Sequence, residues 1–357
     1  MSGPDAALGG GERSLLEQEI LEQPSVLARR RASTEEHARA AGRVLTAEGV
    51  SHVVIAARGS SDNAARYAQY LFGSQLRLAT YLAAPSLFAD GRGTGLDGAA
   101  VLGISQSGQS PDVVAVLLAA RAQDRPTVAV TNDPSSPLAA AADVVVPLMA
   151  GAERSVAATK SYTATLAALV QITAAAGADQ LRDGLDRLPE LVGTAIDECR
   201  DPTTPPLDPA AGSILAGLTT VGRGTGYATA AETALKIREV AGVRAESYAL
   251  PDLLHGPIAA NLAGSEAWVI ASPSYPVAYW EQLAARMTAE GVRVTAVAGE
   301  RDVLSAYRVL RLPRGLPPWL FDLVAVVPGQ VAALRLGEAR GLDVDAPRGL
   351  AKVTRTR

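Results

Sequence analysis

Residues 101–114 read VLGISQSGQSPDVV, and this stretch decides the fold. Its beginning is an apolar run that ends at Ile104 and is typical of a strand buried on both faces of a sheet. Small hydroxyl residues and glycine then predict a tight turn, and Pro111 suits the first position of a helix. A buried strand followed at once by a turn and a helix predicts a parallel α/β unit.

The turn in this stretch admits two interpretations. It offers backbone N–H groups, the positive end of a helix dipole and the hydroxyls of Ser105, Ser107 and Ser110, which together are the parts of a phosphate cradle. The alternative is a serine N-cap in an ordinary connection between strand and helix. It is not a Walker loop, because no Gly-Lys-Ser or Gly-Lys-Thr follows. A similar turn at residues 57–63 is expected at the same sheet edge.

Short β-branched runs alternate with alanine-rich stretches along the chain, which predicts parallel strands joined by crossover helices. In the first half we expect helices at 62–72 and 111–123, and strands at 52–57, 100–104, 127–131 and 143–147. After a proline-rich linker at 201–209, a second series of strands is expected at 218–222, 267–272, 293–298 and 307–312. Before both series, a helix is expected to start at Ser14, break near Pro24 and resume over 26–45.

The two series match in order and spacing. Arg58–Ser60 aligns with Arg223–Thr225, 165 residues later, and Ser105–Ser107 aligns with Ser272–Ser274, 167 residues later. A nearly constant offset at two independent points indicates a duplicated α/β unit, although two unrelated α/β domains remain the alternative.

Composition excludes several classes of protein. The 33 Lys and Arg against 37 Asp and Glu give a net charge of −4, which argues against a nucleic-acid partner, so the basic cluster 29–31 is expected to be a solvated helix face. The single Cys199 excludes a disulfide framework and a thiolate metal cluster, and it fits a reducing cytoplasm. No apolar run reaches the roughly 18 residues that span a bilayer, and the N-terminus is polar, so we expect neither a membrane protein nor an exported one.

A second cluster lies at residues 231–257, which read AETALKIREVAGVRAESYALPDLLHGP. Glu232, Lys236 and Glu239 are spaced by four and three and therefore share one face of a helix. The pattern also fits an exposed ion-pair ladder, but the alanines around it indicate a helix that packs on its other faces. His255 follows in a Leu-His-Gly-Pro turn, where a histidine is commonly structural or solvated.

A third cluster is the C-terminus, where residues 343–357 read DVDAPRGLAKVTRTR. Chain ends usually fray. This one carries a proline turn and has apolar Leu350 and Val353 on either side of Lys352, which predicts a tail that docks onto the protein.

Together these clusters resemble the sugar isomerase family, whose phosphosugar-binding fold occurs duplicated in the isomerase half of glucosamine-6-phosphate synthase. The resemblance runs from EILEQPSVLARR at 19–30 to the last residues. The combination of ALKIREV, HGP in step behind it and PRGLAKVT at the end is highly specific. The implied fold is α/β, with two tandem three-layer α/β/α domains built on parallel sheets.

The resemblance also implies roles for individual residues. One group would hold a phosphate: Ser105, Gln106, Ser107 and Ser110. A second group would contact the sugar: Ser60, Ser61, Val156 and Ala351. A third group would surround the reacting carbons, with Glu232 supporting it: Lys236, Glu239, His255 and Lys352. The family further implies a homodimer in which the histidine of the HGP turn reaches into the neighbour's site.

The sequence departs from the synthase pattern at three points. Gln109-Ser110 stands where the synthase has Glu-Thr, so the hydroxyl is retained. Ala158 stands where the synthase has a serine, which removes one hydroxyl near the sugar. Residues 1–51 precede the first expected strand and Cys199 is the sole cysteine, so we expect no glutaminase domain and no glutamine hydrolysis in this chain.

We therefore expect a partly disordered leader at 1–23, domains at 24–200 and 210–340, and a tail at 341–357 that closes the site. The expected reaction is the isomerising deamination of an amino-sugar 6-phosphate, with no metal or other cofactor, in the cytoplasm. Two other enzymes of the same fold are alternatives: a fructosamine-6-phosphate deglycase, and a synthase that uses ammonia or a separate glutaminase. A phosphosugar-sensing regulator is the alternative without catalysis, but phosphate sensing would require neither Glu239 nor Lys352.

Overall fold

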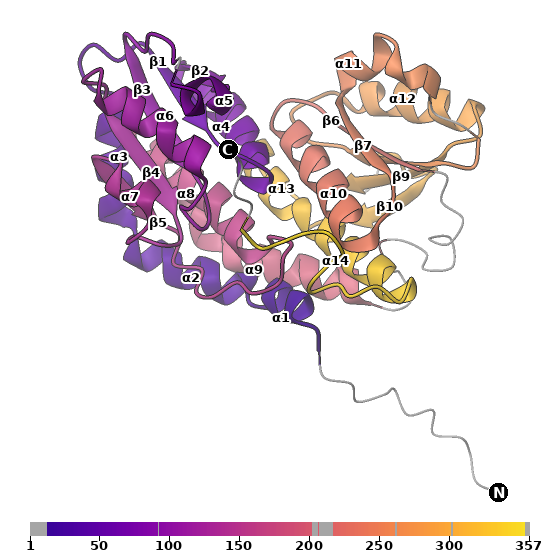
Figure 1. Ribbon diagram of the computed structural model, residues 1–357. Helices are drawn as coiled ribbons and strands as arrows, with labels where there is room; N and C mark the ends of the chain where they lie inside the picture. Colours follow the sequence, from indigo (N-terminus) through magenta and orange to yellow (C-terminus); the bar gives the residue numbers. More distant parts are fainter. Residues whose placement is uncertain are drawn as a thin grey trace, which may run out of the picture.

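The computed structural model describes residues 13–91, 93–201, 206, 217–260, 263–300 and 303–353. Figure 1 shows two α/β units, coloured indigo to magenta and orange, joined by helices that run between and beneath them. Most of the expected linker at 201–209, the first part of the expected leader and the last four residues of the tail lie outside the described residues.

The first unit contains a five-stranded sheet in which every neighbouring pair of strands is parallel. The strand order is β2-β1-β3-β4-β5. The strands are β1 (His52–Ala56), β2 (Ala79–Leu82), β3 (Ala99–Ile104), β4 (Thr127–Thr131) and β5 (Val144–Pro147). Every residue of β3 and β4 is buried, as their continuous apolar runs predict.

The second unit repeats this arrangement. Its parallel sheet has the order β10-β9-β8-β6-β7, which is the order of the first sheet read from the other edge. The strands are β6 (Leu218–Gly222), β7 (Ala245–Ala249), β8 (Glu266–Ile270), β9 (Arg293–Ala298) and β10 (Arg308–Arg311). The same topology in both units confirms the predicted tandem α/β fold.

The sequence patterns missed β2 and β7, which occupy equivalent edge positions in the two sheets. Their sequences, ATYL and AESYA, leave most side chains partly or fully exposed. Edge strands contact one neighbour and need no continuous apolar run, so the pattern that found the central strands does not find them.

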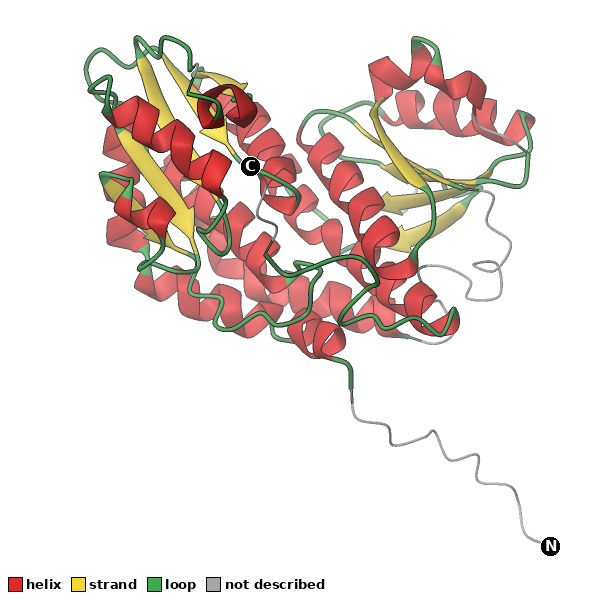
Figure 2. Cartoon of the chain, viewed as in Figure 1, coloured by secondary structure: helices red, strands yellow, loops and turns green. Residues whose placement is uncertain are grey.

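Helices cover both faces of each sheet, which gives the three layers of Figure 2. The helices of the first unit and the connection are α1 (Leu15–Leu21), α2 (Gln23–Ser33), α3 (Glu35–Leu45), α4 (Ser60–Leu76), α5 (Pro85–Ala89), α6 (Pro111–Arg121), α7 (Pro137–Ala140), α8 (Lys160–Ala175) and α9 (Arg182–Arg200). Those of the second unit are α10 (Thr225–Ala241), α11 (Leu250–Leu254), α12 (Val277–Ala289), α13 (Pro318–Val324) and α14 (Val326–Ala339).

Ser14 caps α1, and the helix breaks at Glu22 beside Pro24, which lies in the first turn of α2, as expected. Two other expectations near the N-terminus were wrong. The helix predicted over 26–45 divides at Thr34, whose hydroxyl donates back to the Arg30 carbonyl. The basic cluster 29–31 is not a uniformly solvated face, because Arg30 is 1% exposed and donates to Gln171 at 2.7 Å. Burial lowers the pKa of Arg30 to about 9.

One hydrophobic cluster spans both units, and each unit has a further cluster of its own. The cluster that contains Tyr67 of α4 also contains Ile237 of α10 and Val331 of α14. The Tyr67 hydroxyl donates to the Trp319 carbonyl at 2.9 Å, which ties the first unit to α13. This continuous packing holds α4 and α10 against each other.

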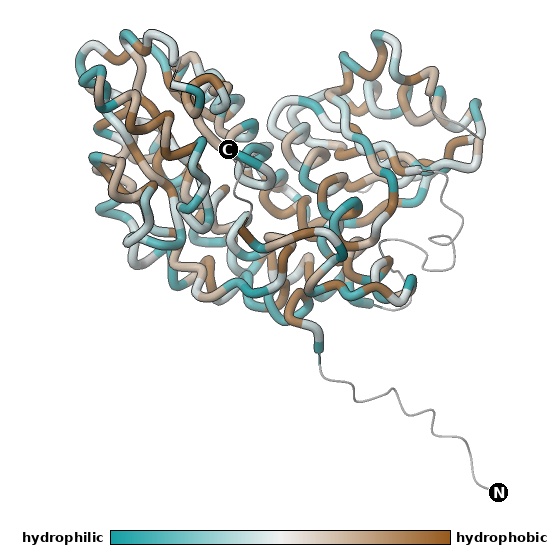
Figure 3. Tube along the Cα trace, viewed as in Figure 1, coloured by the Kyte–Doolittle hydropathy of each residue, from teal (hydrophilic) through white to brown (hydrophobic). Residues whose placement is uncertain are grey.

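The stretch Pro318–Ala339 is long and apolar enough to cross a membrane, and the described residues contain no second stretch of this kind. Its most apolar window is 94% buried inside the protein, as expected of a core helix. Figure 3 shows hydrophobic segments inside both units and in the helices between them.

Close helix packing beside the site generates the first prediction. A Cβ added at Gly329 of α14 would lie 2.5 Å from the Thr233 hydroxyl oxygen of α10. We expect Gly329→Ala to lower the free energy of unfolding by about 1–3 kcal/mol, because the helices must separate. In the control Gly193→Ala within α9, the added Cβ would lie 3.6 Å from Pro24, an ordinary contact, so no loss of stability is expected. Urea denaturation measures both, and equal stabilities would contradict the prediction.

Candidate functional site

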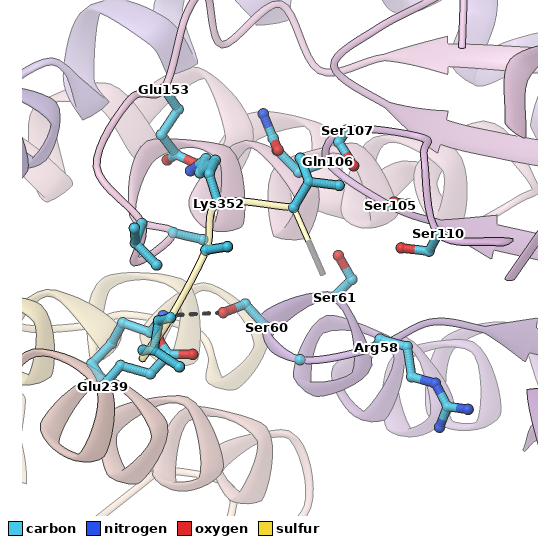
Figure 4. Close-up of a pocket in the computed structure, with 17 residues that line it drawn as sticks. Arg58, Ser60, Ser61, Ser105, Gln106, Ser107, Ser110, Glu153, Glu239 and Lys352 are labelled. Carbon is cyan, nitrogen blue, oxygen red and sulfur yellow. Dashed lines mark hydrogen bonds and ion pairs between the residues drawn. The ribbon is translucent and has the colours of Figure 1, made fainter. Parts of the chain in front are cut away.

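A cavity of about 290 Å³ lies between the two units, at the carboxyl edge of the first sheet. Strands β1 and β3 are neighbours whose connections leave in opposite directions, and ligands of open α/β sheets bind at such a point. Figure 4 shows that two turns, one loop, α10 and the tail surround it, with the Arg58 side chain directed away from the other labelled residues. The lining residues are Arg58, Gly59, Ser60, Ser61, Ser105, Gln106, Ser107, Ser110, Glu153, Val156, Ala158, Lys236, Glu239, Leu350, Ala351, Lys352 and Val353.

The turn between β3 and α6 lines one end of the cavity. Gly108 adopts φ +62° there, and a Cβ at this position would lie 2.0 Å from the Ser136 hydroxyl oxygen, so glycine is required. Ser110 occupies the N-cap position of α6, but its side chain makes no capping hydrogen bond. Ser110 is thus the N-cap residue by position only, and its hydroxyl is directed to the cavity beside the positive end of the helix dipole.

The turn between β1 and α4 joins the first unit to α10. The Ser60 hydroxyl donates to Glu232 at 2.9 Å, and the Asn63 side chain donates to the other oxygen of the same carboxylate at 2.8 Å. Glu232 is completely buried and does not line the cavity. Burial raises the pKa of this carboxyl group above its ordinary value, although Lys236 and Asn63 oppose that rise.

The acidic and basic residues of α10 do not form an exposed ladder. Lys236 is 1% exposed, and its ammonium lies 2.5 Å from Glu239 and 3.5 Å from Glu232. Burial lowers the pKa of Lys236, but the charges of Glu232 and Glu239 outweigh burial and the net pKa is raised. Lys236 therefore carries a charge at neutral pH, while Glu239 faces the cavity and remains partly exposed.

The loop after β5 and the C-terminal tail complete the wall. Glu153 is fully buried in this loop and accepts a hydrogen bond from the Lys352 ammonium at 2.8 Å. The Val156 N–H donates to the Asp345 carbonyl at 2.9 Å, which fixes the loop to the tail. The predicted docking of the tail thus places Ala351 and Lys352 at the cavity (Figure 4).

Two of the predicted site residues do not line the cavity. Glu232 lies behind the wall, where it supports Ser60 and Lys236. His255 is exposed in the turn after α11, on the second unit. The remaining predicted residues line the cavity together, and their individual roles stay predictions.

Two charged residues of the wall were missed as site residues. Glu153 follows β5 at the same sheet edge as the two predicted turns. Residues that follow parallel strands meet at this edge, so the same reasoning applied to β5 would have identified Glu153. Arg58 belongs to a turn that the sequence singled out, but its own role was not recognised. Its side chain lies 2.7 Å from Asp112, which is in the first turn of α6.

In the second unit, the turn that corresponds to the one at Gly59 is filled by the side chain of Tyr275. A Cβ at Gly224, which corresponds to Gly59, would lie 2.6 Å from the Tyr275 hydroxyl oxygen. The Arg223 guanidinium lies over the ring of Tyr275 at 4.5 Å, in a cation–π contact. The second unit therefore does not repeat the open turn of the first.

Metal ligands are not grouped in the part of the chain that the structure describes. No three His, Cys, Asp or Glu side chains there come together in the manner of a metal site. The side chains that line the cavity carry hydroxyl groups, the amide of Gln106, the guanidinium of Arg58, two ammonium groups and two carboxylates.

Comparison with known proteins agrees with the geometry. The model of the SIS domain family matches residues 48–175. Over 98% of its length the chain is 32% identical to glutamine-fructose-6-phosphate aminotransferase (isomerizing) from Methanothermobacter thermautotrophicus, and 34% identical to the enzyme of that name from Aeropyrum pernix. The chain spans 58% of the length of each of these relatives.

A crystal structure from Silicibacter pomeroyi DSS-3, provisionally assigned as a phosphosugar isomerase, is 31% identical, with a TM-score of 0.84. The match covers 93% of this chain and 100% of that one. With this match and the family model, the chain belongs to the SIS domain family.

Proposed function

We propose that the chain is a phosphosugar isomerase that deaminates an amino-sugar 6-phosphate, converting glucosamine 6-phosphate and water to fructose 6-phosphate and ammonia. The observation that carries this proposal is the division of one cavity into two chemically different ends. Ser105, Ser107 and Ser110 lie at one end, and Glu239 and Lys352 lie at the other.

The serine end suits a phosphate. Three hydroxyls and the N-terminus of α6 supply hydrogen-bond donors and a positive dipole end for an anion.

The α10 end suits the transfer of a proton between two carbons. In the open-chain substrate, Glu239 would take the proton from C2, the electron pair of the C1–O1 double bond would move to O1, and O1 would take a proton from a neighbouring ammonium group to give the enolamine. Glu239 would return its proton to C1 while the substrate nitrogen gives one proton back to the amine, which leaves the ketimine that water hydrolyses to the ketone and ammonia. A positioned general base contributes about 10²- to 10⁴-fold to such a step.

Lys236 and Lys352 would stabilise negative charge that develops on the substrate oxygens. We retain the prediction of a homodimer in which His255 of a second copy opens the sugar ring. That arrangement is compatible with an exposed His255, since the residue is free to contact another chain.

A second candidate is amination in the reverse direction. It is supported by the names of the relatives from Methanothermobacter thermautotrophicus and Aeropyrum pernix, which are aminotransferases. Both reactions use the same enolamine. Incubation with hexosamine 6-phosphates and fructosamine 6-phosphates, with assays for ammonia, amine and fructose 6-phosphate, tests the proposed direction. Incubation with fructose 6-phosphate and ammonia tests the reverse, and conversion in neither panel would contradict the proposed function.

The phosphate end yields a binding prediction. Ser107→Ala removes one hydroxyl that would bind a charged phosphate, worth about 1.5–3 kcal/mol, so affinity for the phosphosugar should fall about 10- to 100-fold. Stability should change little, because Ser107 lies in a loop at the cavity. Calorimetry measures the affinity. The control is Ser33→Ala at the exposed end of α2, which should leave the affinity unchanged. Unchanged affinity in Ser107→Ala would show that the turn does not hold the phosphate.

The second unit is predicted to bind no phosphosugar, so one ligand per chain is expected. Pro273 and Pro276 remove two backbone donors from the turn at 272–276, and Tyr275 of this turn fills the space beside Gly224. A crystal structure soaked with sugar phosphate should show a ligand at 105–110. An equally occupied ligand at 272–276 would contradict this prediction.

Glu239 provides the test of mechanism. Glu239→Gln keeps the size of the side chain and an oxygen for Lys236 but removes the base, so binding should be retained while turnover falls by at least about 10²-fold. Exchange of the C2 hydrogen with deuterated water, followed by NMR, should stop. The control is Glu338→Gln, which removes a surface pair with Arg335 on α14 and should cost at most about 1 kcal/mol with turnover kept. Continued exchange in folded Glu239→Gln would assign the proton transfer to another group.

A further inference from the structure

Lysine is rare in this chain and is placed unusually. Among 33 basic residues the sequence contains three lysines, Lys160, Lys236 and Lys352, and the others are arginines. Each lysine is paired with a glutamate, and two of the three line the cavity. Lys160 and Glu153, which is the partner of Lys352, both lie in residues 152–160. This loop therefore connects the two ion pairs.

Glu153 is the centre of this loop. One carboxylate oxygen accepts from the backbone N–H groups of Thr159 and Ser161, both at 3.0 Å. The other oxygen accepts from the Ser161 hydroxyl at 2.6 Å and from the Lys352 ammonium at 2.8 Å. Burial raises the pKa of Glu153, but Lys352 and Ser161 outweigh burial and the net pKa is lowered. The group is therefore a buried anion with a fixed position.

Helices outside the cavity hold the loop on both sides of Glu153. The Lys160 ammonium donates to the Ala152 carbonyl at 2.6 Å and to Glu22 of the α1–α2 junction at 2.5 Å. The Ser155 hydroxyl donates to the carboxylate of Glu19 in α1. These contacts leave the Glu153 side chain little freedom to follow Lys352 if the tail moves.

The tail, in contrast, is held at separate points. Its Asp345 carboxylate accepts the N–H groups of Leu15 and Leu16 at the start of α1, at 3.0 and 2.8 Å. Further along, Leu350 and Val353 are 46% and 37% exposed. Between those exposed residues, the ion pair of Lys352 with Glu153 ties this end of the tail to the first unit.

We propose that Glu153 is a positioning residue: its carboxylate, fixed by the loop that α1 and α2 clamp, holds the Lys352 ammonium at the reacting end of the cavity. This inference rests on the proposed function, in which Lys352 contacts the substrate. Lysine suits the position because its ammonium is a compact charge that one carboxylate oxygen can place.

The first test is spectroscopic and needs no turnover. Protein labelled with ¹³C at lysine Cε should give three side-chain signals, one for each lysine. In Glu153→Gln the Lys352 signal should shift most and sharpen, because the ammonium loses its fixed partner. Lys160 keeps its partner Glu22, so its signal should stay in place, and Lys236, which interacts with the charge of Glu153 at longer range, should shift less than Lys352. The matched control Glu22→Gln should move the Lys160 signal instead. An unmoved Lys352 signal in folded Glu153→Gln would overturn the proposal.

The second test is kinetic and separates positioning from general support of the fold. Glu153→Gln should lower kcat by up to about 10²-fold, the cost of a misplaced group, while KM for the phosphosugar changes little because the serines are untouched. In a Lys352→Ala background, the same substitution should add no further loss, since the residue acts through Lys352. If the two substitutions instead lower kcat by independent factors that multiply in the double variant, Glu153 acts independently of Lys352 and the proposal is overturned.

A milder variant keeps the test decisive if Glu153→Gln does not fold. Ser161→Ala removes the hydroxyl that donates to Glu153 but leaves both charges, so a smaller shift of the Lys352 signal and a smaller loss of kcat are expected. Absence of both effects would contradict the proposal. If the wild-type chain converts no phosphosugar, the proposed function fails, while the lysine signals still show whether Glu153 holds Lys352.

Discussion

The buried carboxylate of Glu232 is the interaction on which the site depends. It lies on α10 of the second unit, yet its oxygens accept from Ser60 and Asn63 in the first unit and its charge stabilises Lys236 beside it. A buried carboxylate that lost these partners would be costly to keep in the interior. The two units therefore bring the serines and the α10 charges together in a defined geometry. Neither unit contains both halves of the cavity.

Duplication supplied the frame and divergence made the two units different. Both sheets have the same strand order, and Gly59 and Gly224 adopt nearly the same positive φ before α4 and α10. In the first unit the equivalent turns remain open and carry serines. In the second unit Tyr275 fills the turn, and α10 instead presents its charged face to the first unit. One unit thus offers a binding edge, and the other offers the groups for chemistry.

The sequence predicted those features that local patterns encode. Central strands such as β3 are continuous apolar runs, and a turn at the end of such a strand must lie at the sheet edge, so Ser105 and Ser107 could be placed. Lys352 could be placed at the site only through the family resemblance, since no local pattern gives the path of a tail. The contacts of Glu153 were beyond reach for the same reason: its partner Lys352 lies 199 residues away in the sequence.

The charges of the site explain why its assembly requires both ends of the chain. Glu153, Glu232 and Lys236 are buried, their partners Lys352 and Glu239 are only partly exposed, and an unpaired charge in such a place is expensive. Such a set favours one arrangement strongly, because moving any member leaves another without a partner. Asp345 binds the first turn of α1, and Glu19 of α1 binds the loop that carries Glu153. The N-terminal helix is therefore part of the support that determines where the tail places its lysine.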